Sequence, residues 1–218
     1  GSSAIITATF RALMKFYNVD ISRHILPNWV LATEMEELKI TGGLQDRVCQ
    51  SYEGLVYMDF NRAKMERDGF GRYESLDVSL LPSLYVAYKT KLAEGSEVVH
   101  NNLRERWLSG DKVVLETMKQ LAELTEDARL HLLKGDKQGF GTLMDANFDL
   151  RRKIINISKS HLEMVEVARE CGVTANFTGS GGAIVGTYPD DMSYVLVKEK
   201  LGSIGCEVFR LELAQLLR

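Results

Sequence analysis

The order of the segments after residue 158 is the strongest constraint on the fold. Helical and extended patterns follow one another there as helix, strand, glycine turn, strand, helix and strand. The two strands beside the glycine turn are expected at 173–178 and 183–187. Together with a further strand at 84–88 and the helices after it, this order predicts an antiparallel sheet with helices on one face. The predicted fold class is therefore α+β, not a doubly wound parallel sheet.

The start of the chain is predicted to be a helix packed into the core. Apolar residues recur there at i, i+4, i+7 and i+11, which is the spacing of one helix face. The four positions are Ile6, Phe10, Leu13 and Tyr17. This spacing predicts a buried helix over 3–17, which ends in the region of Asn18 and Asp20.

The remaining elements follow from turn and capping signals. Asp68-Gly69 indicates a hairpin-type turn between two extended segments. Ser160 and Glu163 form a capping box for a helix that ends at Gly172. Further helices are expected at 27–39, 44–52, 97–108, 111–134, 136–155 and 190–201, and further strands at 22–26, 54–60 and 204–210.

The length suits one large domain or two small ones, at roughly 100–200 residues per domain. The change from mixed segments to long helices places a division near residues 80–95, and we expect two domains, 1–85 and 86–218. The chain has 45% hydrophobic and 26% charged residues, which indicates a folded globular protein rather than a disordered one. Its net charge of −3 argues against electrostatic wrapping of nucleic acid.

Neither a membrane nor a disulfide framework is expected. No apolar run approaches the roughly 20 residues of a membrane span, and the start lacks the pattern of a signal peptide. The three cysteines, Cys49, Cys171 and Cys206, are widely spaced and odd in number. They suggest neither a zinc site nor paired disulfides, so a reducing, cytoplasmic compartment is the simplest expectation.

Two segments are candidates for binding an anion. The first is Gly1-Ser2-Ser3-Ala4 at a helix start, where free N–H groups favour an anion and a serine hydroxyl can reach magnesium. Simple N-capping by serine, or a tag scar, explains the same residues. The second is the glycine turn between the strands, whose successive N–H groups can form an anion nest. An ordinary glycine-rich hairpin is the alternative there. The residues of this turn are Gly179, Ser180, Gly181 and Gly182.

Two further groups could carry chemistry. Glu34 and Asp46 flank the break at Thr41-Gly42-Gly43, and two such carboxylates can converge on a metal and a substrate hydroxyl. A solvated helix face is the alternative. The second group is basic and polar, and arginine is the natural partner of a carboxylate or phosphate; surface solvation is its alternative. Its members are Arg47, His100, Arg104, Arg106, Asn147, Arg151 and Arg152.

Taken together and in this order, these residues resemble the GHMP kinase superfamily of small-molecule kinases, and within it the plant-type kinases of D-glucuronate. The resemblance runs from residue 1 to about residue 212. The stretches that carry it, besides the first four residues, are Gly42–Arg47, Tyr52–Phe60, Arg104–Trp107, Asn147–Arg152, Glu163–Arg169 and Phe177–Ala183.

The resemblance implies a role for each matching residue. Ser3 would contact Mg²⁺ and Glu34 would be the second magnesium ligand. Asp46, with Arg47 beside it, would orient or deprotonate the sugar hydroxyl. The phosphate-binding positions for ATP would be Gly1, Ser2, Ser3, Ala4, Gly179, Ser180, Gly181 and Gly182. The substrate-binding positions would be Asp46, Arg104, Asn147 and Arg151.

The implied fold is the remainder of a ribosomal-S5-like domain followed by a ferredoxin-like antiparallel sheet. The implied reaction transfers the γ-phosphoryl group of ATP to the anomeric hydroxyl of D-glucuronate, a small sugar acid. Family members begin with a strand-rich segment that precedes residue 1 of this sequence. That segment is absent from this sequence, so the chain would be a C-terminal fragment of such a kinase, and a partner chain or the missing segment would complete its sheet. Two alternatives stay open: a non-catalytic interaction protein derived from a truncated kinase fold, or a kinase of another sugar such as heptose, fucose or galactose.

Overall fold

The computed structural model describes residues 1–40, 42–89, 103–179 and 182–212 of the 218-residue chain. The chain divides into two compact units, one comprising Gly1–Val78 and one beginning at Ser79. Each unit has its own sheet. Among the described helices, none is both long and apolar enough to cross a membrane.

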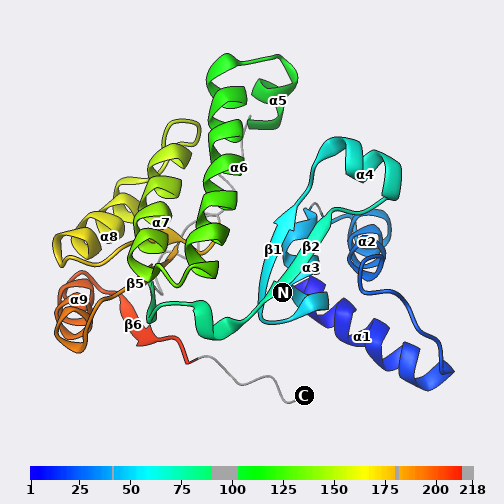
Figure 1. Ribbon diagram of the computed structural model, residues 1–218, viewed down its shortest axis with the longest axis horizontal. Coiled ribbons are helices and arrows are strands. Elements are labelled where there is room, and N and C mark those ends of the chain that lie inside the picture. The colour runs from blue at the N-terminus through cyan, green and yellow to red at the C-terminus, as the bar shows by residue number, and fades with distance from the viewer. Residues whose placement is uncertain (41, 90–102, 180–181, 213–218) are drawn as a thin grey trace. The chain divides into compact units, whose positions relative to one another are not determined.

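The described residues of the first unit form four α-helices, one π-helix and a two-stranded antiparallel sheet (Figure 1). The strands pair from Leu55 opposite Leu76 to Asp59 opposite Arg72. The helix predicted over 44–52 and the strand predicted over 54–60 are confirmed. The elements are α1 (Ser2–Tyr17), α2 (Leu26–Ala32), the π-helix η1 (Thr33–Glu37), α3 (Leu44–Tyr52), β1 (Leu55–Asp59), α4 (Arg62–Asp68) and β2 (Arg72–Leu76).

Two local predictions in this unit are wrong. The segment 22–26 is not a strand, because Leu26 and Pro27 are buried at the start of α2 and proline favours that helical position. Asp68-Gly69 is not a hairpin turn: Asp68 ends α4, and Gly69 is the left-handed C-cap with φ 78°. The Asn61 side chain accepts a hydrogen bond from the Lys64 N–H, so a short helix forms inside the connection between β1 and β2.

The burial of α1 also differs from the prediction. Its buried residues are polar, Ser3 and Thr7. Leu13 and Tyr17, which the spacing placed in the core, are exposed, and Phe16 is 79% exposed. The hydrophobic spacing predicted the helix correctly, but among the described residues of this helix no apolar side chain is fully buried.

The second unit is built on a four-stranded antiparallel sheet with the order β4-β5-β3-β6. Val86 of β3 lies opposite Val185 of β5 on one side and Phe209 of β6 on the other. This sheet confirms the predicted α+β class. The elements of the unit are the 3-10 turn η2 (Val78–Leu80, which begins one residue before the unit), β3 (Leu84–Tyr88), α5 (Leu103–Leu108), α6 (Lys112–Leu133), α7 (Lys137–Arg151), α8 (Lys159–Glu170), β4 (Asn176–Phe177), β5 (Ala183–Thr187), α9 (Asp191–Ser203) and β6 (Glu207–Arg210).

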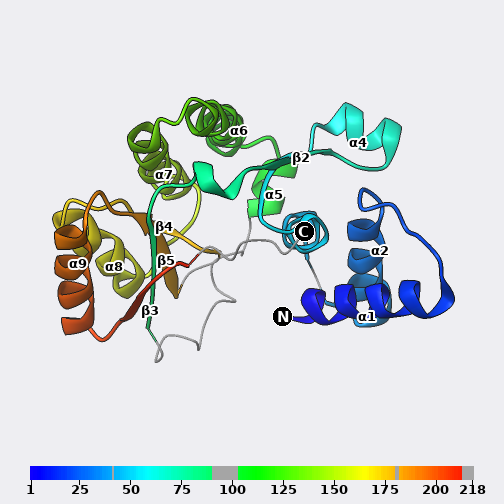
Figure 2. The same cartoon turned by 60° about the horizontal axis from the view of Figure 1, so that its bottom comes forward.

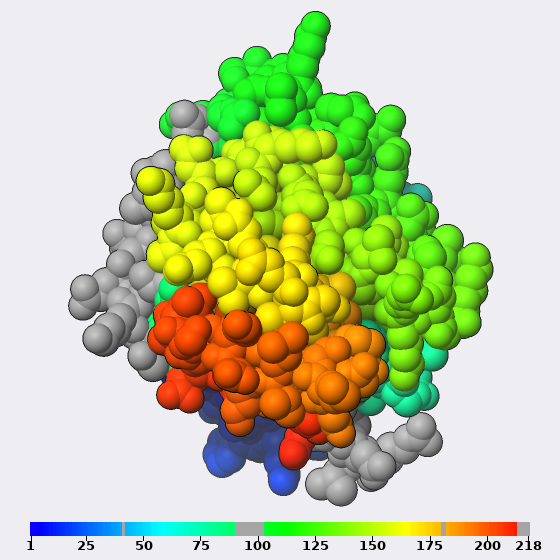
Figure 3. Space-filling view, turned by 90° about the vertical axis from the view of Figure 1, so that its left-hand side faces the viewer, coloured from blue at the N-terminus to red at the C-terminus, as the bar shows by residue number. Residues whose placement is uncertain are grey.

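The hydrophobic core of the second unit lies between one face of this sheet and the helices α7, α8 and α9. Ala87 is opposite Ile184 and Val208, so these three buried side chains share a face. Phe148 of α7 and Met164 of α8 pack against that face and are fully buried. Figure 2 shows α8 and α9 beside the sheet, and Figure 3 shows their outer surface.

Helix ends in the second unit differ from the predictions by a few residues. The cap of α8 is Ser158, whose hydroxyl accepts from the His161 N–H, rather than Ser160. The helix predicted to continue to 155 ends at Arg151. Of the helix predicted over 97–108, residues 103–108 are helical, and residues 97–102 lie outside the described part of the chain.

Candidate functional site

The first candidate site lies at the start of α1. The Ser2 hydroxyl donates a hydrogen bond to Glu34 Oε1 at 2.7 Å. The Glu34 side chain is fully buried, although its neighbours Met35, Glu36 and Glu37 are exposed. A π-helical turn at 33–37 carries Glu34, and such turns are frequent at functional sites. The solvated-face alternative is therefore wrong for Glu34 and fits only the two other glutamates.

Arg47 of α3 neutralises this buried carboxylate. Its Nε donates to Glu34 Oε2 at 2.7 Å, and its Nη2 forms an ion pair with the same oxygen. Its Nη1 donates to the Gly43 carbonyl oxygen at 2.8 Å. A buried carboxylate needs a paired charge and satisfied hydrogen bonds, and Arg47 together with Ser2 supplies both.

Asp46 has a different environment although it precedes Arg47. Its side chain is 77% exposed, and Oδ2 lies 3.8 Å from Arg47 Nη1. Asp46 is thus free to accept a proton or a hydrogen bond from a ligand. One turn further along α3, burial first and then the charge of Asp46 raise the pKa of the Cys49 thiol. Cys49 is therefore a weak nucleophile at neutral pH.

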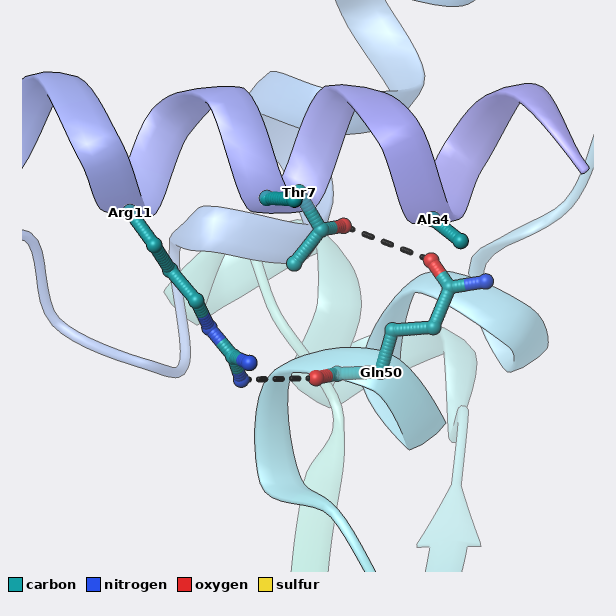
Figure 4. A pocket seen from close by; sticks show the side chains of 5 residues that line it. Ala4, Thr7, Arg11 and Gln50 are labelled. Carbon is teal, nitrogen blue, oxygen red and sulfur yellow. Dashed lines mark hydrogen bonds between the residues drawn. The ribbon is translucent and has the colours of Figure 1, made fainter.

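Ser3, unlike Ser2, forms its side-chain hydrogen bond with a residue other than Glu34. Its hydroxyl oxygen accepts a hydrogen bond from Gln50 Nε2 at 2.9 Å, and its carbonyl oxygen accepts one from Thr7 at 2.8 Å. The Thr7 hydroxyl also lies 3.3 Å from Gln50 Oε1, as Figure 4 shows. Gln50 was not predicted as a site residue, although it lies four residues after Asp46 on the same helix face.

A hollow of about 370 Å³ adjoins this contact between α1 and α3 (Figure 4). It is lined by Ala4, Thr7, Ala8, Arg11 and Gln50. Arg11 is engaged by the Gln50 carbonyl oxygen at 2.8 Å and by Glu53 at 2.6 Å. The hollow therefore has small apolar residues and an ion-paired rim.

The donor set beside α1 suits magnesium that arrives with a phosphate group. Ser2 Oγ and Glu34 Oε1 are 2.7 Å apart, close to the roughly 3 Å between neighbouring ligands of an octahedral ion with bonds of about 2.1 Å. Among the described residues, no group of three histidine, cysteine or acidic side chains could hold a metal ion. One carboxylate and one hydroxyl require phosphate oxygens and water to complete the shell. The ligand roles of Glu34 and Ser3 both stay predictions.

The second candidate site is the glycine turn of the second unit, of which Gly179 and Gly182 are described. Gly182 has φ 79°, a conformation that glycine adopts without strain. Arg151 Nη2 donates to the Gly179 carbonyl oxygen at 2.6 Å, and Nη1 lies 3.4 Å from Asn176 Oδ1. Burial lowers the pKa of the Arg151 guanidinium, which still carries its charge at neutral pH.

The other predicted substrate residues separate into two groups. Asn147 belongs with Arg151, because its Oδ1 accepts from Asn176 Nδ2 at 2.9 Å. Arg104 lies on the exposed side of α5. Its neighbour Arg106 binds Asp111 at 2.8 Å and the Ile154 carbonyl oxygen at 3.0 Å, so Arg106 is structural. Ser180 and Gly181 lie outside the described residues.

Comparison with known proteins identifies relatives. Glucuronokinase 1 of Arabidopsis thaliana is 43% identical over 208 residues, covering 92% of this chain and 56% of the plant protein. L. major mevalonate kinase, solved in complex with R-mevalonate, superposes with a TM-score of 0.72 at 20% identity, over 96% of this chain and 64% of that one. Lactococcus lactis galactokinase, solved in complex with galactose, superposes with a TM-score of 0.67 at 16% identity, over 96% of this chain and 64% of that one. No family model matches the chain.

The fold is that of the GHMP kinases, the class that includes mevalonate kinase and galactokinase. In sequence, the chain is a homologue of the plant glucuronokinases. It spans about half the length of these curated relatives.

Proposed function

We propose that the protein carrying this chain is an ATP-dependent sugar kinase that phosphorylates the anomeric hydroxyl of D-glucuronate. The observation that supports this most directly is the pair formed by buried Glu34 and the Ser2 hydroxyl, with exposed Asp46 nearby on α3. The glucuronokinase named above is the relative from which the sugar and the reaction are taken. The first unit would be the remainder of the N-terminal kinase domain, and the second its C-terminal domain.

In this proposal the chain mainly positions the reactants. Glu34 and a serine at the start of α1 would hold Mg²⁺, which would supply positive charge beside the ATP phosphates. Asp46 orients the sugar hydroxyl and accepts its proton, and its exposure leaves it open to a ligand. Gly1 provides no side-chain cap for α1, so the N–H groups of the first turn would be available to the phosphates.

Asp46→Asn tests the proposed base. The variant removes the proton acceptor from an exposed position, so phosphoryl transfer to glucuronate should fall at least about 100-fold while thermal stability is unchanged. Glu36→Gln is the matched control, since it removes one exposed carboxylate from the same unit. Equal rates for the two variants would rule out Asp46 as the base. A wild-type protein inactive on every sugar tested would favour the non-catalytic alternative.

Arg151→Met tests whether an arginine recognises the acid group of the sugar. A charge-assisted hydrogen bond contributes about 1.5–3 kcal/mol, so its loss should lower kcat/KM for glucuronate roughly ten- to a hundred-fold. A neutral hexose should be affected far less. Because Arg151 also holds the Gly179 carbonyl oxygen, equal losses on both sugars would mean that it only shapes the glycine turn. Arg62→Met, at an exposed position of α4 that belongs to neither candidate site, is the control.

Location and partners complete the proposal. Cys49, Cys171 and Cys206 are free thiols, which supports a reducing compartment, and we place the protein in the cytoplasm. ATP, Mg²⁺ and a sugar acid are the expected ligands. The exposed apolar side chains of α1 support a further polypeptide segment packing on the first unit.

A further inference from the structure

We propose that Arg47 and Gly42 form a positioning pair for Glu34: Arg47 fixes which carboxylate oxygen faces Ser2, and Gly42 provides the space that Arg47 needs. This inference rests on the proposed function, because it takes Glu34 as the magnesium ligand. It assigns Arg47 a role through another residue rather than contact with the sugar.

The hydrogen bonds of Glu34 divide cleanly between its two oxygens. Arg47 binds Oε2 through both Nε and Nη2, while Oε1 accepts only from the Ser2 hydroxyl among the bonds of the described residues. Because the guanidinium is planar and holds one oxygen from two nitrogens, it restricts rotation of the carboxylate. Oε1 is thereby presented beside the hydroxyl with which it would share a cation. Partners that orient a metal ligand in this way influence metal affinity without touching the metal.

The backbone before α3 holds the guanidinium from its other side. Arg47 Nη1 donates to the Gly43 carbonyl oxygen. A Cβ atom at Gly42 would lie 2.5 Å from Arg47 Nη2 and 2.9 Å from Arg47 Cζ. Even one methyl group at this position would therefore push the guanidinium away from its present place. Since Arg47 is buried and paired on both sides, it cannot move aside without weakening the bonds to Glu34.

Gly43 provides the matched control, because a Cβ atom there would meet nothing within 4 Å. Its φ of −125° suits any residue. Gly42→Ala and Gly43→Ala therefore add the same methyl group to adjacent positions. Neither substitution alters a charged, hydroxyl or amide side chain. A difference between them reports the displacement of Arg47.

The experiment measures binding of Mn²⁺, a spectroscopic substitute for Mg²⁺, to the full-length protein with a non-hydrolysable ATP analogue, by electron paramagnetic resonance. Loss of an orienting partner typically lowers metal affinity 10- to 100-fold. Gly42→Ala should therefore weaken Mn²⁺ binding about 10-fold, and Gly43→Ala less than 2-fold. Arg47→Lys keeps the positive charge but cannot bind Glu34 Oε2 through two nitrogens. It should therefore weaken Mn²⁺ binding about as much as Gly42→Ala does.

Thermal unfolding of the same variants separates positioning from stability. A purely structural role for Arg47 predicts a lower Tm for Gly42→Ala and Arg47→Lys with unchanged Mn²⁺ affinity, and this result would overturn the inference. Equal affinities of the two alanine variants would also overturn it. Wild-type protein that binds Mn²⁺ with the analogue but phosphorylates no sugar would overturn the proposed function alone. Absence of Mn²⁺ binding to the wild type would overturn both.

Discussion

The long helices of the two units begin in different ways. In the second unit, α6, α7, α8 and α9 each start with an Asp or Ser whose side chain accepts a backbone N–H. In the first unit, α1 and α3 start at Gly1 and Gly43, without a side-chain cap. A capped helix end has satisfied its own donors, whereas an uncapped end leaves them for another partner. The first candidate site thus borders uncapped helix starts, whereas the second uses Asn147 and Arg151 near the C-terminal end of the capped helix α7.

The cores of the two units also differ in how much of their buried part is apolar. In the second unit a continuous cluster joins four strands to three helices. In the first unit the buried cluster consists of Val48, Tyr52 and Tyr73, with partly buried neighbours. Its best-buried charged residues are Glu34 and Arg47, which belong to the candidate site. The second unit is thus stabilised mainly by apolar packing, and the first more by polar contacts.

The largest expected effect concerns the core of the second unit. Phe148 is fully buried, so Phe148→Ala should lower the free energy of unfolding by about 3–5 kcal/mol. Phe16→Ala, the same change at a side chain that is 79% exposed, should stay within about 0.5 kcal/mol. Urea denaturation of both variants measures the difference. A loss of more than about 2 kcal/mol for Phe16→Ala would show that α1 is packed in solution.

A somewhat smaller effect is expected from breaking the buried ion pair of the first unit. Glu34→Ala leaves the Arg47 guanidinium buried without its carboxylate, which should cost on the order of 3 kcal/mol. The double variant Glu34→Leu with Arg47→Met removes both charges and should recover most of that loss. The free energies of unfolding of the single and double variants give the comparison. A double variant as unstable as the single one would mean that the pair itself stabilises the unit.

The smallest effect is a pH dependence from a helix cap. Asp136 lies at the start of α7. The hydrogen bond from the Gly139 N–H, and to a smaller extent the hydrogen bond with the His131 side chain, lowers the pKa of its carboxyl group. A lowered folded pKa gives stability that is present above the unfolded value of about 3.9 and is lost as pH falls through the folded value. Asp136→Asn keeps a capping oxygen but does not titrate, so its acid unfolding curve should be less steep below about pH 4. Circular dichroism between pH 6 and pH 2 tests this, and superimposable curves would contradict it.

The sequence by itself determined the order of most elements, the antiparallel character of the second sheet and the resemblance to the GHMP kinases. These features follow from local periodicity, from glycine at turns and from motifs in a fixed order. The same local signals failed at 22–26, where buried Leu26 and Pro27 begin a helix. They failed again at Asp68-Gly69, where Asn61 caps a helix within the connection.

Only the tertiary structure decided which side chains meet. Periodicity shows that α1 has an apolar face, but whether that face is buried depends on what packs against it, and here Ser3 and Thr7 are the buried residues. From their spacing in the sequence, the carboxylates of Glu34 and Asp46 were expected to converge on a metal and a substrate hydroxyl. The fold buries Glu34 between Ser2 and Arg47 and leaves Asp46 exposed, because desolvation and pairing of a charge are set by neighbours distant in sequence.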